Sequence, residues 1–304
     1  MNWERDELLA KARLFAERGM EVERDSGLVP FWCTLSLELL ARAALAHIHP
    51  VLLADPQQGE NLLYAFGYPA TNPRSIQTKT VLSRCQVVVE RFTKAEEEFC
   101  ASLLFLRNEE LHTGTAAFEN LPTSQWLVKF FYACQILLEH MGLDLSDLLP
   151  PDEVGPAQMM LNADAESVRS EVLEAIGRAR SDFLALDGTE QERLETLADE
   201  DARDRRAHEG MITSCPACQN QGIVDGEILR ATDPHLVGDL LKWETVILPT
   251  SFQCTACGLV LNGFNRMEAA SIGGQHTLEH WEDPVDYYGE QALGSYREPE
   301  YGND

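Results

Sequence analysis

The sequence predicts a mainly α-helical chain that ends in a small β module. Three observations lead to this fold class. Apolar side chains recur at helical spacing through most of the first 208 residues. The stretch from Phe31 to Ile48 is apolar on nearly every face, as expected for a helix at the centre of a core. In the last third, two Cys-x2-Cys pairs are flanked by short runs that read as strands.

Helices are expected first at Trp3 to Arg18, at Phe31 to Ile48 and, after a loop around Pro69 and Pro73, from Thr78 to the end of the motif at His112. A further helix is expected from Trp126 to Met141. The long helix that ends at His112 carries two apolar stripes, the second formed by Cys100, Leu104 and Leu111. We therefore expect it to pack on two sides, against its own core and against a dimer partner.

Proline and acidic residues between Asp147 and Pro156 predict a boundary after the first domain, residues 1–147. Residues 148–208 are then a proline-containing linker and helical connector, interrupted at Gly188. The module with the cysteine pairs covers 209–268. The acidic tail, 269–304, is expected to be flexible or docked on a partner, because its last thirty residues contain eight acidic side chains and one arginine.

Charge and hydropathy limit the classes of function. The formal net charge of -26 arises from 20 acidic and 13 basic residues in 1–150 and from 30 acidic and 11 basic residues in 151–304. This balance disfavours a broad surface that coats nucleic acid, since phosphate binding depends on Lys and Arg. The chain has no run of 18 apolar residues, and its charged start is unlike a signal peptide. We expect a cytoplasmic protein without a membrane partner.

The segment from Arg107 to Gly114 combines a guanidinium, an amide and an imidazole. Arg107 can hold a phosphate through a fork of charged donors. His112 can take or give a proton near neutral pH, and Asn108 can orient one of the other two groups. Such a set suits cleavage of a phosphodiester by its own 2′-hydroxyl, which needs no metal and is possible in RNA but not in DNA.

Helix geometry constrains this candidate site. Arg107 and His112 are five residues apart, which places them about 140° out of phase on one helix, whereas Asn108 and His112 share a face. Arg107 therefore completes the site from the fraying helix end or from a second copy of the chain across a twofold axis.

The Arg107-x4-His112 pattern, with Asn108 after the arginine, resembles the signature of the HEPN superfamily. The apolar helix up to Ile48, the long helix that leads into the motif and the helix from Trp126 resemble the rest of that all-α domain, so the resemblance covers about the first half of the chain. It implies a metal-independent endoribonuclease that acts as a dimer in a toxin, antiviral or RNA-processing system, with Arg107, Asn108 and His112 as catalytic residues. Other members of the family are inactive or serve as binding modules.

Two alternatives remain at this stage. In one alternative, Arg107 and His112 are ordinary solvated residues in a last helical turn, where cations favour the helix dipole. Glu38, the odd acidic residue in the core helix, either pairs with Arg42 one turn on or points toward the active pocket.

The four cysteines Cys215, Cys218, Cys254 and Cys257 form two knuckle motifs, and four thiolates suit tetrahedral zinc. The arrangement resembles a zinc ribbon with an insertion between its halves. The zinc is expected to be structural, because no ligand position is left open for a substrate. Four other cysteines, Cys33, Cys85, Cys100 and Cys134, lie singly in apolar helical patterns and are expected to be buried thiols.

The sequence thus predicts an endoribonuclease with RNA as substrate, a homodimeric assembly and a structural zinc ribbon. The rival prediction is a non-catalytic adaptor, in which the helical domain dimerises and the ribbon or the acidic tail recruits a protein partner.

Overall fold

The computed structural model describes residues 3–24, 26–119, 121–207 and 210–295. The chain divides into two compact units, residues 1–167 and 168–304. The boundary falls inside a long helix, α7 (Pro151–Leu184), and each unit has its own hydrophobic core. The boundary expected near residue 147 stays a prediction, and Pro151 is the first residue of α7, which continues to Leu184.

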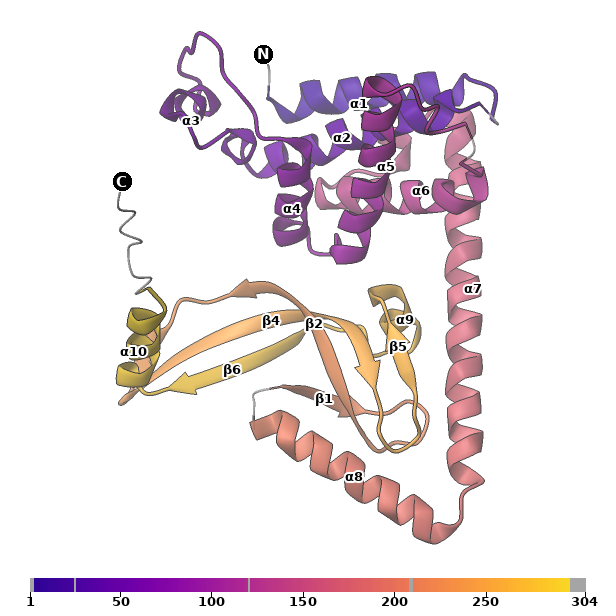
Figure 1. Ribbon diagram of the computed structural model, residues 1–304, viewed down its shortest axis with the longest axis vertical. Coiled ribbons are helices and arrows are strands. Elements are labelled where there is room, and N and C mark those ends of the chain that lie inside the picture. Colours follow the sequence, from indigo (N-terminus) through magenta and orange to yellow (C-terminus); the bar gives the residue numbers. More distant parts are fainter. Residues whose placement is uncertain (1–2, 25, 120, 208–209, 296–304) are drawn as a thin grey trace, which may run out of the picture. The chain divides into compact units, whose positions relative to one another are not determined.

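The helical unit is built around α2 (Leu28–Ile48), which packs against the other long helices of the unit. In order, the elements are α1 (Arg5–Met20), α2, the 3-10 turn η1 (Pro50–Leu53), α3 (Gly59–Ala65), α4 (Thr78–Val88), α5 (Lys94–His112), α6 (Thr123–His140) and η2 (Leu145–Asp147). Figure 1 shows α1 lying along α2, and the hydroxyl of Ser36 on α2 donates to the carbonyl of Ala12 on α1 at 2.8 Å.

Helix α2 is long and apolar enough to cross a membrane by length and composition alone. Its side chains are instead used inside the protein: Leu40, Ala41, Ala44 and Leu45 are completely buried. Small side chains let neighbouring helices approach α2 closely, which is the behaviour of a core helix. The cytoplasmic location stays a prediction.

The long helix expected from Thr78 to His112 is two helices. Helix α4 ends at Val88, and α5 begins after Thr93, whose hydroxyl accepts from the amide of Ala95 at 3.3 Å. The carboxylate of Glu96 accepts from the amide of Thr93 at 2.9 Å, which completes a capping box. The sequence Thr93-x-x-Glu96 carried this signal.

The four single cysteines are buried in the core of the helical unit, as expected. Burial raises the pKa of the Cys85 thiol from 9.0 to about 12, and it raises the pKa values of Cys33, Cys100 and Cys134 as well. The thiolate is the reactive form of cysteine. These four groups are therefore protected because burial blocks access of reagents and because it keeps the thiols protonated.

Alkylation with iodoacetamide at pH 8 is expected to leave these four thiols unmodified in the native chain and to modify them after denaturation, as read by peptide mass spectrometry. The pKa values of these four thiols in the folded chain lie above 9.0. The contribution that the protonated thiols make to the free energy of unfolding is therefore complete below pH 9.0. It is lost as the pH rises from about 9 through the folded values. Rapid labelling of Cys134 in the native chain at pH 8 would contradict the buried assignment.

The second unit contains a six-stranded antiparallel sheet, which corrects the prediction of a mainly α chain with only a small ribbon. The strands are β1 (Met211–Ser214), β2 (Gln221–Ala231), β3 (His235–Val237), β4 (Leu240–Gln253), β5 (Val260–Asn262) and β6 (His276–Glu282). Strand β4 is the centre: β2 and β3 pair with it, as do β5 and β6. The insertion between the cysteine pairs forms most of this sheet.

Helices accompany the sheet. The end of α7 and helix α8 (Gly188–Ala207) form the predicted connector, interrupted before Gly188, and they share the unit's core through Val172, Phe183 and Ala198. Helix α8 lies along β1 and β2, and the short helix α9 (Phe264–Ala269) packs on β4 and β5.

Part of the tail that was expected to be flexible is ordered. Strand β6 pairs with β4 over seven residue pairs, and helix α10 (Pro284–Ser295) follows it. The His280 ring stacks on Trp243 with centroids 4.9 Å apart and an interplanar angle of 11°. Cross-strand pairing and aromatic stacking outweigh the acidic composition in this segment. Residues 296–304 of the tail lie outside the described residues.

Candidate functional site

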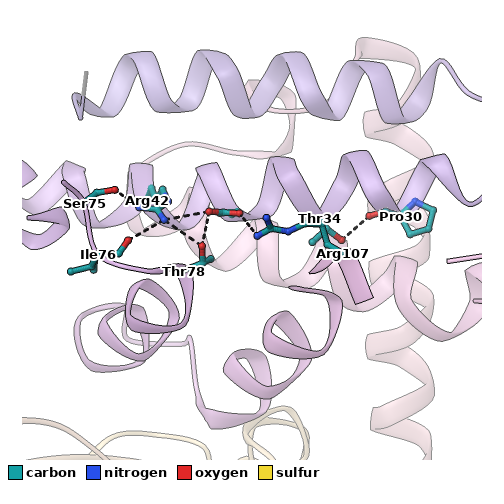
Figure 2. A network of polar contacts seen from close by, with 8 residues as sticks. Pro30, Thr34, Arg42, Ser75, Ile76, Thr78 and Arg107 are labelled. Atoms are coloured by element: carbon teal, nitrogen blue, oxygen red, sulfur yellow. Dashed lines mark hydrogen bonds and ion pairs between the residues drawn. The ribbon is translucent and has the colours of Figure 1, made fainter. Parts of the chain in front are cut away.

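Arg107 lies on the inner side of α5, where it contacts Glu38 of α2. The buried residues Cys100, Leu103 and Leu104 hold this side of α5 against the core. The Arg107 Nη2 donates to Glu38 Oε2 at 2.7 Å, and both side chains are only 17% exposed. Figure 2 shows the guanidinium directed at the carboxylate from the neighbouring helix. Arg107 is thus a fixed, largely buried cation and not a solvated residue of a frayed helix end.

Glu38 is the centre of a polar cluster that joins three helices. Its second oxygen, Oε1, accepts from the Thr78 hydroxyl at 2.6 Å and from Arg42 Nη2 at 3.3 Å. Arg42 also donates to the carbonyl of Ile76 at 3.2 Å and to the hydroxyl of Ser75 at 3.3 Å. Of the two alternatives for Glu38, the structure shows both contacts, one to Arg42 and one to the motif arginine.

The charge of this cluster matters for what it can bind. One carboxylate faces two guanidinium groups, so Glu38, Arg42 and Arg107 together carry a net charge of +1. The Nε atom of Arg107 is buried and has no hydrogen-bond partner within the described part of the chain. A buried donor without an acceptor is costly, so this nitrogen is an unsatisfied polar atom of the helical unit.

Asn108 and His112 lie on the outer side of α5, and both are exposed. His112 is the last residue of the helix. Neither side chain makes a hydrogen bond or ion pair among the residues described. One chain therefore brings Asn108 and His112 to the same face, as the spacing predicted, and keeps Arg107 on a different one.

Helix α5 also exposes two large apolar side chains, Phe105 on the side of Asn108 and His112, and Leu111 one turn after Arg107. Phe105 is 62% exposed and Leu111 is 50% exposed. Phe105, Asn108 and His112 follow one another at spacings of three and four, so they share a face. The expected second stripe is corrected in part: Cys100 and Leu104 belong to the core, and only Leu111 of that stripe is exposed.

The four knuckle cysteines come together in the second unit. The four Sγ atoms lie within 4.8 Å of one another, with Cys215 to Cys257 and Cys218 to Cys254 both at 3.6 Å. Tetrahedral zinc with Zn–S bonds of about 2.3 Å requires sulfur atoms roughly 3.8 Å apart, so the donor set fits. Thiol hydrogen bonds from Cys254 and Cys257 lower the pKa of Cys215, and the same contacts to Cys215 raise the pKa values of Cys254 and Cys257, so the first thiolate forms at Cys215.

The two knuckles have the same backbone geometry. In each, the residue after the second cysteine is left-handed, Gln219 with φ 67° and Gly258 with φ 72°. Its amide donates to the carbonyl of the first cysteine, at 3.0 Å for Gln219 and 2.9 Å for Gly258. The first knuckle connects β1 to β2, and the second connects β4 to β5. Because β2 pairs with β4, this pairing holds the two pairs of thiols together.

Replacing Gly258 by alanine is expected to destabilise the second unit by about 1 kcal/mol, because a Cβ atom is unfavourable at positive φ. The matched change Gln219→Gly is expected to stabilise it by a similar or smaller amount, since the same strain is relieved. Thermal melting of the metal-loaded chains checks both signs. Equal melting temperatures for wild type and Gly258→Ala would contradict the strained geometry.

The fold and these two sites define a two-unit protein, with a helical unit organised around an arginine–glutamate cluster and a β unit organised around four cysteines. No protein-family model matches the chain, and neither the curated proteins nor the solved structures contain a match. The comparisons therefore leave the resemblance to the HEPN superfamily untested.

Sequence reasoning identified the cysteines and the motif but missed part of the arginine cluster. Thr78 was read only as the start of a helix, and Arg42 only as a local partner of Glu38. The contact between Glu38 and Arg107 joins residues 69 positions apart. No local spacing signals such a contact, although one acidic residue inside an apolar helix indicates that a cation must reach it.

Proposed function

We propose that the chain is a metal-independent endoribonuclease of the HEPN type that cleaves RNA by attack of the 2′-hydroxyl. The observation that carries the proposal is at the end of α5. A guanidinium fixed by Glu38, with a buried Nε that has no hydrogen-bond partner among the described residues, lies one residue from an exposed amide and five from an exposed imidazole. The net positive cluster suits one phosphate, and the acidic remainder of the chain limits non-specific binding.

In the proposed mechanism each motif residue has one role. Arg107 stabilises the charge that develops on the phosphorane oxygens, His112 transfers the proton of the 2′-oxygen or of the leaving oxygen, and Asn108 orients His112 or the phosphate. The bond that forms joins the 2′-oxygen to phosphorus, and the bond that breaks releases the 5′-oxygen of the next nucleotide. The products are a 2′,3′-cyclic phosphate and a 5′-hydroxyl end.

The two faces of α5 lead us to propose a homodimer as the active assembly. Phe105 and Leu111 add exposed apolar surface near Asn108 and His112 that a second copy would cover. Two copies of the motif would then meet at one cleft, and the phase difference between Arg107 and His112 is bridged by residues from both chains.

The test is RNA cleavage by the full chain without added divalent metal. Wild type is expected to cut RNA, whereas Arg107→Ala and His112→Ala lose about 100-fold or more. Arg74→Ala, an exposed arginine of the same unit, and His235→Ala, an exposed histidine of the second unit, are matched controls expected to retain activity. A substrate with a single 2′-deoxy position should resist cleavage there, and equal cleavage by all the variants would exclude this site.

Mixing the two inactive variants tests the dimeric site. If each site takes Arg107 from one chain and His112 from the other, mixed dimers of Arg107→Ala and His112→Ala contain one intact site and recover activity. Phe105→Glu should yield monomers in sedimentation, whereas Phe66→Glu, at a residue that is 60% exposed on the same unit, should not change the mass.

The second candidate is the non-catalytic adaptor, and one observation favours it. Glu38 already forms an ion pair with the Arg107 guanidinium, so the arginine also has a role in holding α2 and α5 together. This alternative gives a dimer without RNase activity, in which Asn108 and His112 can be replaced without loss of partner binding. The cleavage assay separates the two functions.

For the second unit, we propose that the four cysteines hold a structural zinc ion. Cys215 and Cys254 are buried, Cys218 and Cys257 are half-buried, and all four positions are sulfur, which leaves no open position for a substrate. Elemental analysis should find one zinc per chain, and none after replacement of Cys254 by serine.

A further inference from the structure

The tips of the two knuckles are held by different contacts from the neighbouring helices. At the first tip, Arg180 of α7 donates from Nε to the carbonyl of Ala217 at 2.9 Å and from Nη2 to the carbonyl of Pro216 at 3.0 Å. At the second tip, the Thr255 hydroxyl donates to the carboxylate of Asp201 on α8. Equivalent positions of two similar knuckles thus meet a cation on one side and an anion on the other.

Arg180 is linked to the Sγ atom of Cys215 through one residue, Ala217. The amide of Ala217, the residue whose carbonyl Arg180 holds, donates to the Sγ of Cys215 at 3.4 Å. Ala217 is 3% exposed, so its peptide groups are fixed beneath the helix. Two donors of one planar guanidinium grip consecutive carbonyls, which fixes the tip in a way that one hydroxyl contact cannot.

The charges near the two knuckles also favour a more stable first knuckle. A zinc ion with four thiolates has a net charge of -2. A guanidinium beside the first knuckle offsets part of this charge, whereas the carboxylate of Asp201 beside the second knuckle adds to it. Residues outside the ligand set that orient ligands in this way typically change metal affinity by about 10- to 100-fold.

We propose that Arg180 is a positioning residue of the metal centre: it locks the first knuckle, and the ion leaves by opening of the second knuckle, at Cys254 and Cys257. This inference rests on the proposed zinc site. It assigns a role in metal retention to the helical connector, which the ligand spacing alone does not reveal. Because Arg180 itself is exposed, the expected effect is at the lower end of the range.

The first experiment measures transfer of zinc from the loaded full chain to a coloured chelator. Arg180→Met is expected to lower zinc affinity about tenfold, and Arg180→Lys, which keeps the charge but loses the fork, less than that. Arg178→Met is the matched control on the same helix, because Arg178 is exposed and makes no hydrogen bond or ion pair with either knuckle among the described residues; it should bind zinc like wild type. Unchanged affinity in Arg180→Met would overturn the proposal.

The second experiment separates positioning from general stability. Iodoacetamide is added during chelation, and peptide mass spectrometry records which cysteines react first. In wild type, Cys254 and Cys257 should react before Cys215 and Cys218. Arg180→Met should abolish this order. Val172→Ala, which creates a cavity at a buried residue of α7 and so lowers general stability, should speed the reaction of all four cysteines and preserve the order.

The outcomes distinguish the two proposals. If the purified chain holds no zinc and binds none, the proposed metal site fails. If zinc binds with one ion per chain but all four cysteines react together in wild type, the metal site stands and the role of Arg180 is wrong.

Discussion

Removal of the proposed zinc ion is expected to unfold the sheet of the second unit while the helical unit stays folded. Structural zinc contributes about 10 to 16 kcal/mol in small zinc-binding peptides at neutral pH, which exceeds the stability of most domains. Here the four thiols lie at the end of the β2–β4 pairing, and the core around them is small: Cys215, Ala217, Phe252, Cys254, Ala256 and Leu261 are among its buried residues. Without the ion, the two knuckles are joined only through the β2–β4 pairing, this small core and the contacts from the neighbouring helices, which we expect to be too weak to keep the sheet folded.

Hydrogen exchange read by mass spectrometry checks this expectation. After treatment with a strong zinc chelator, peptides from β1, β2, β4 and β5 should lose protection, and peptides from α2 and α5 should keep it. Cys254→Ser should behave like the chelated chain. Cys134→Ala, which changes a buried thiol of the helical core, should retain the metal and a protected sheet. Persistent protection of β4 in the chelated chain would show that the sheet is stable without metal.

Replacement of Glu38 by alanine is expected to destabilise the helical unit by about 3 kcal/mol, the largest effect of any single change in the arginine cluster. The side chains of Arg42 and Arg107 are 13% and 17% exposed, and loss of the carboxylate leaves both guanidinium groups without their counter-charge. Thr78 loses the acceptor of its hydroxyl as well.

The reverse change is expected to cost less. Arg107→Ala leaves Glu38 paired with Arg42 and Thr78, so a loss of only about 1 kcal/mol is expected. Chemical denaturation of Glu38→Ala and Arg107→Ala, with Arg74→Ala as an exposed control, measures this order. If Arg107→Ala proved as destabilising as Glu38→Ala, the carboxylate would not be the centre of the cluster.

This asymmetry also separates folding from catalysis. Arg107→Ala is expected to abolish RNA cleavage in a chain that remains folded, whereas Glu38→Ala reduces both stability and activity. Glu38→Gln keeps the shape and an acceptor for Thr78 but removes the charge, so its stability should lie between that of wild type and Glu38→Ala.

The sequence predicted those features that depend on local spacing. The knuckle cysteines are fixed by their Cys-x2-Cys pattern, and the strands next to them follow from β-branched runs. The central helix up to Ile48 follows from its apolar composition. The phase of Asn108 and His112 follows from helical geometry alone and agrees with their shared exposed face.

Other features depend on partners that are distant in the sequence. The pairing of β6 with β4 was hidden, because Glu279 and Glu282 made the segment look disordered and its paired residues lie 29 to 41 positions earlier. The division between α4 and α5 was missed because the apolar pattern continues across it, although Thr93 and Glu96 marked it. Glu38 and Arg107 meet only when α2 and α5 pack.

The motif residues on α5 differ in how strongly the fold depends on them, and therefore in how easily they can be replaced during evolution. Arg107 is tied to Glu38 and to the core, so its replacement is expected to lower the stability of the helical unit somewhat, although the chain stays folded. Asn108 and His112 are exposed and make no side-chain bonds within the described chain, so they can change at little cost to the fold. A lineage that abandons catalysis would therefore lose the histidine first and keep the arginine, and an arginine retained without its histidine would mark a descendant that has become a binding module.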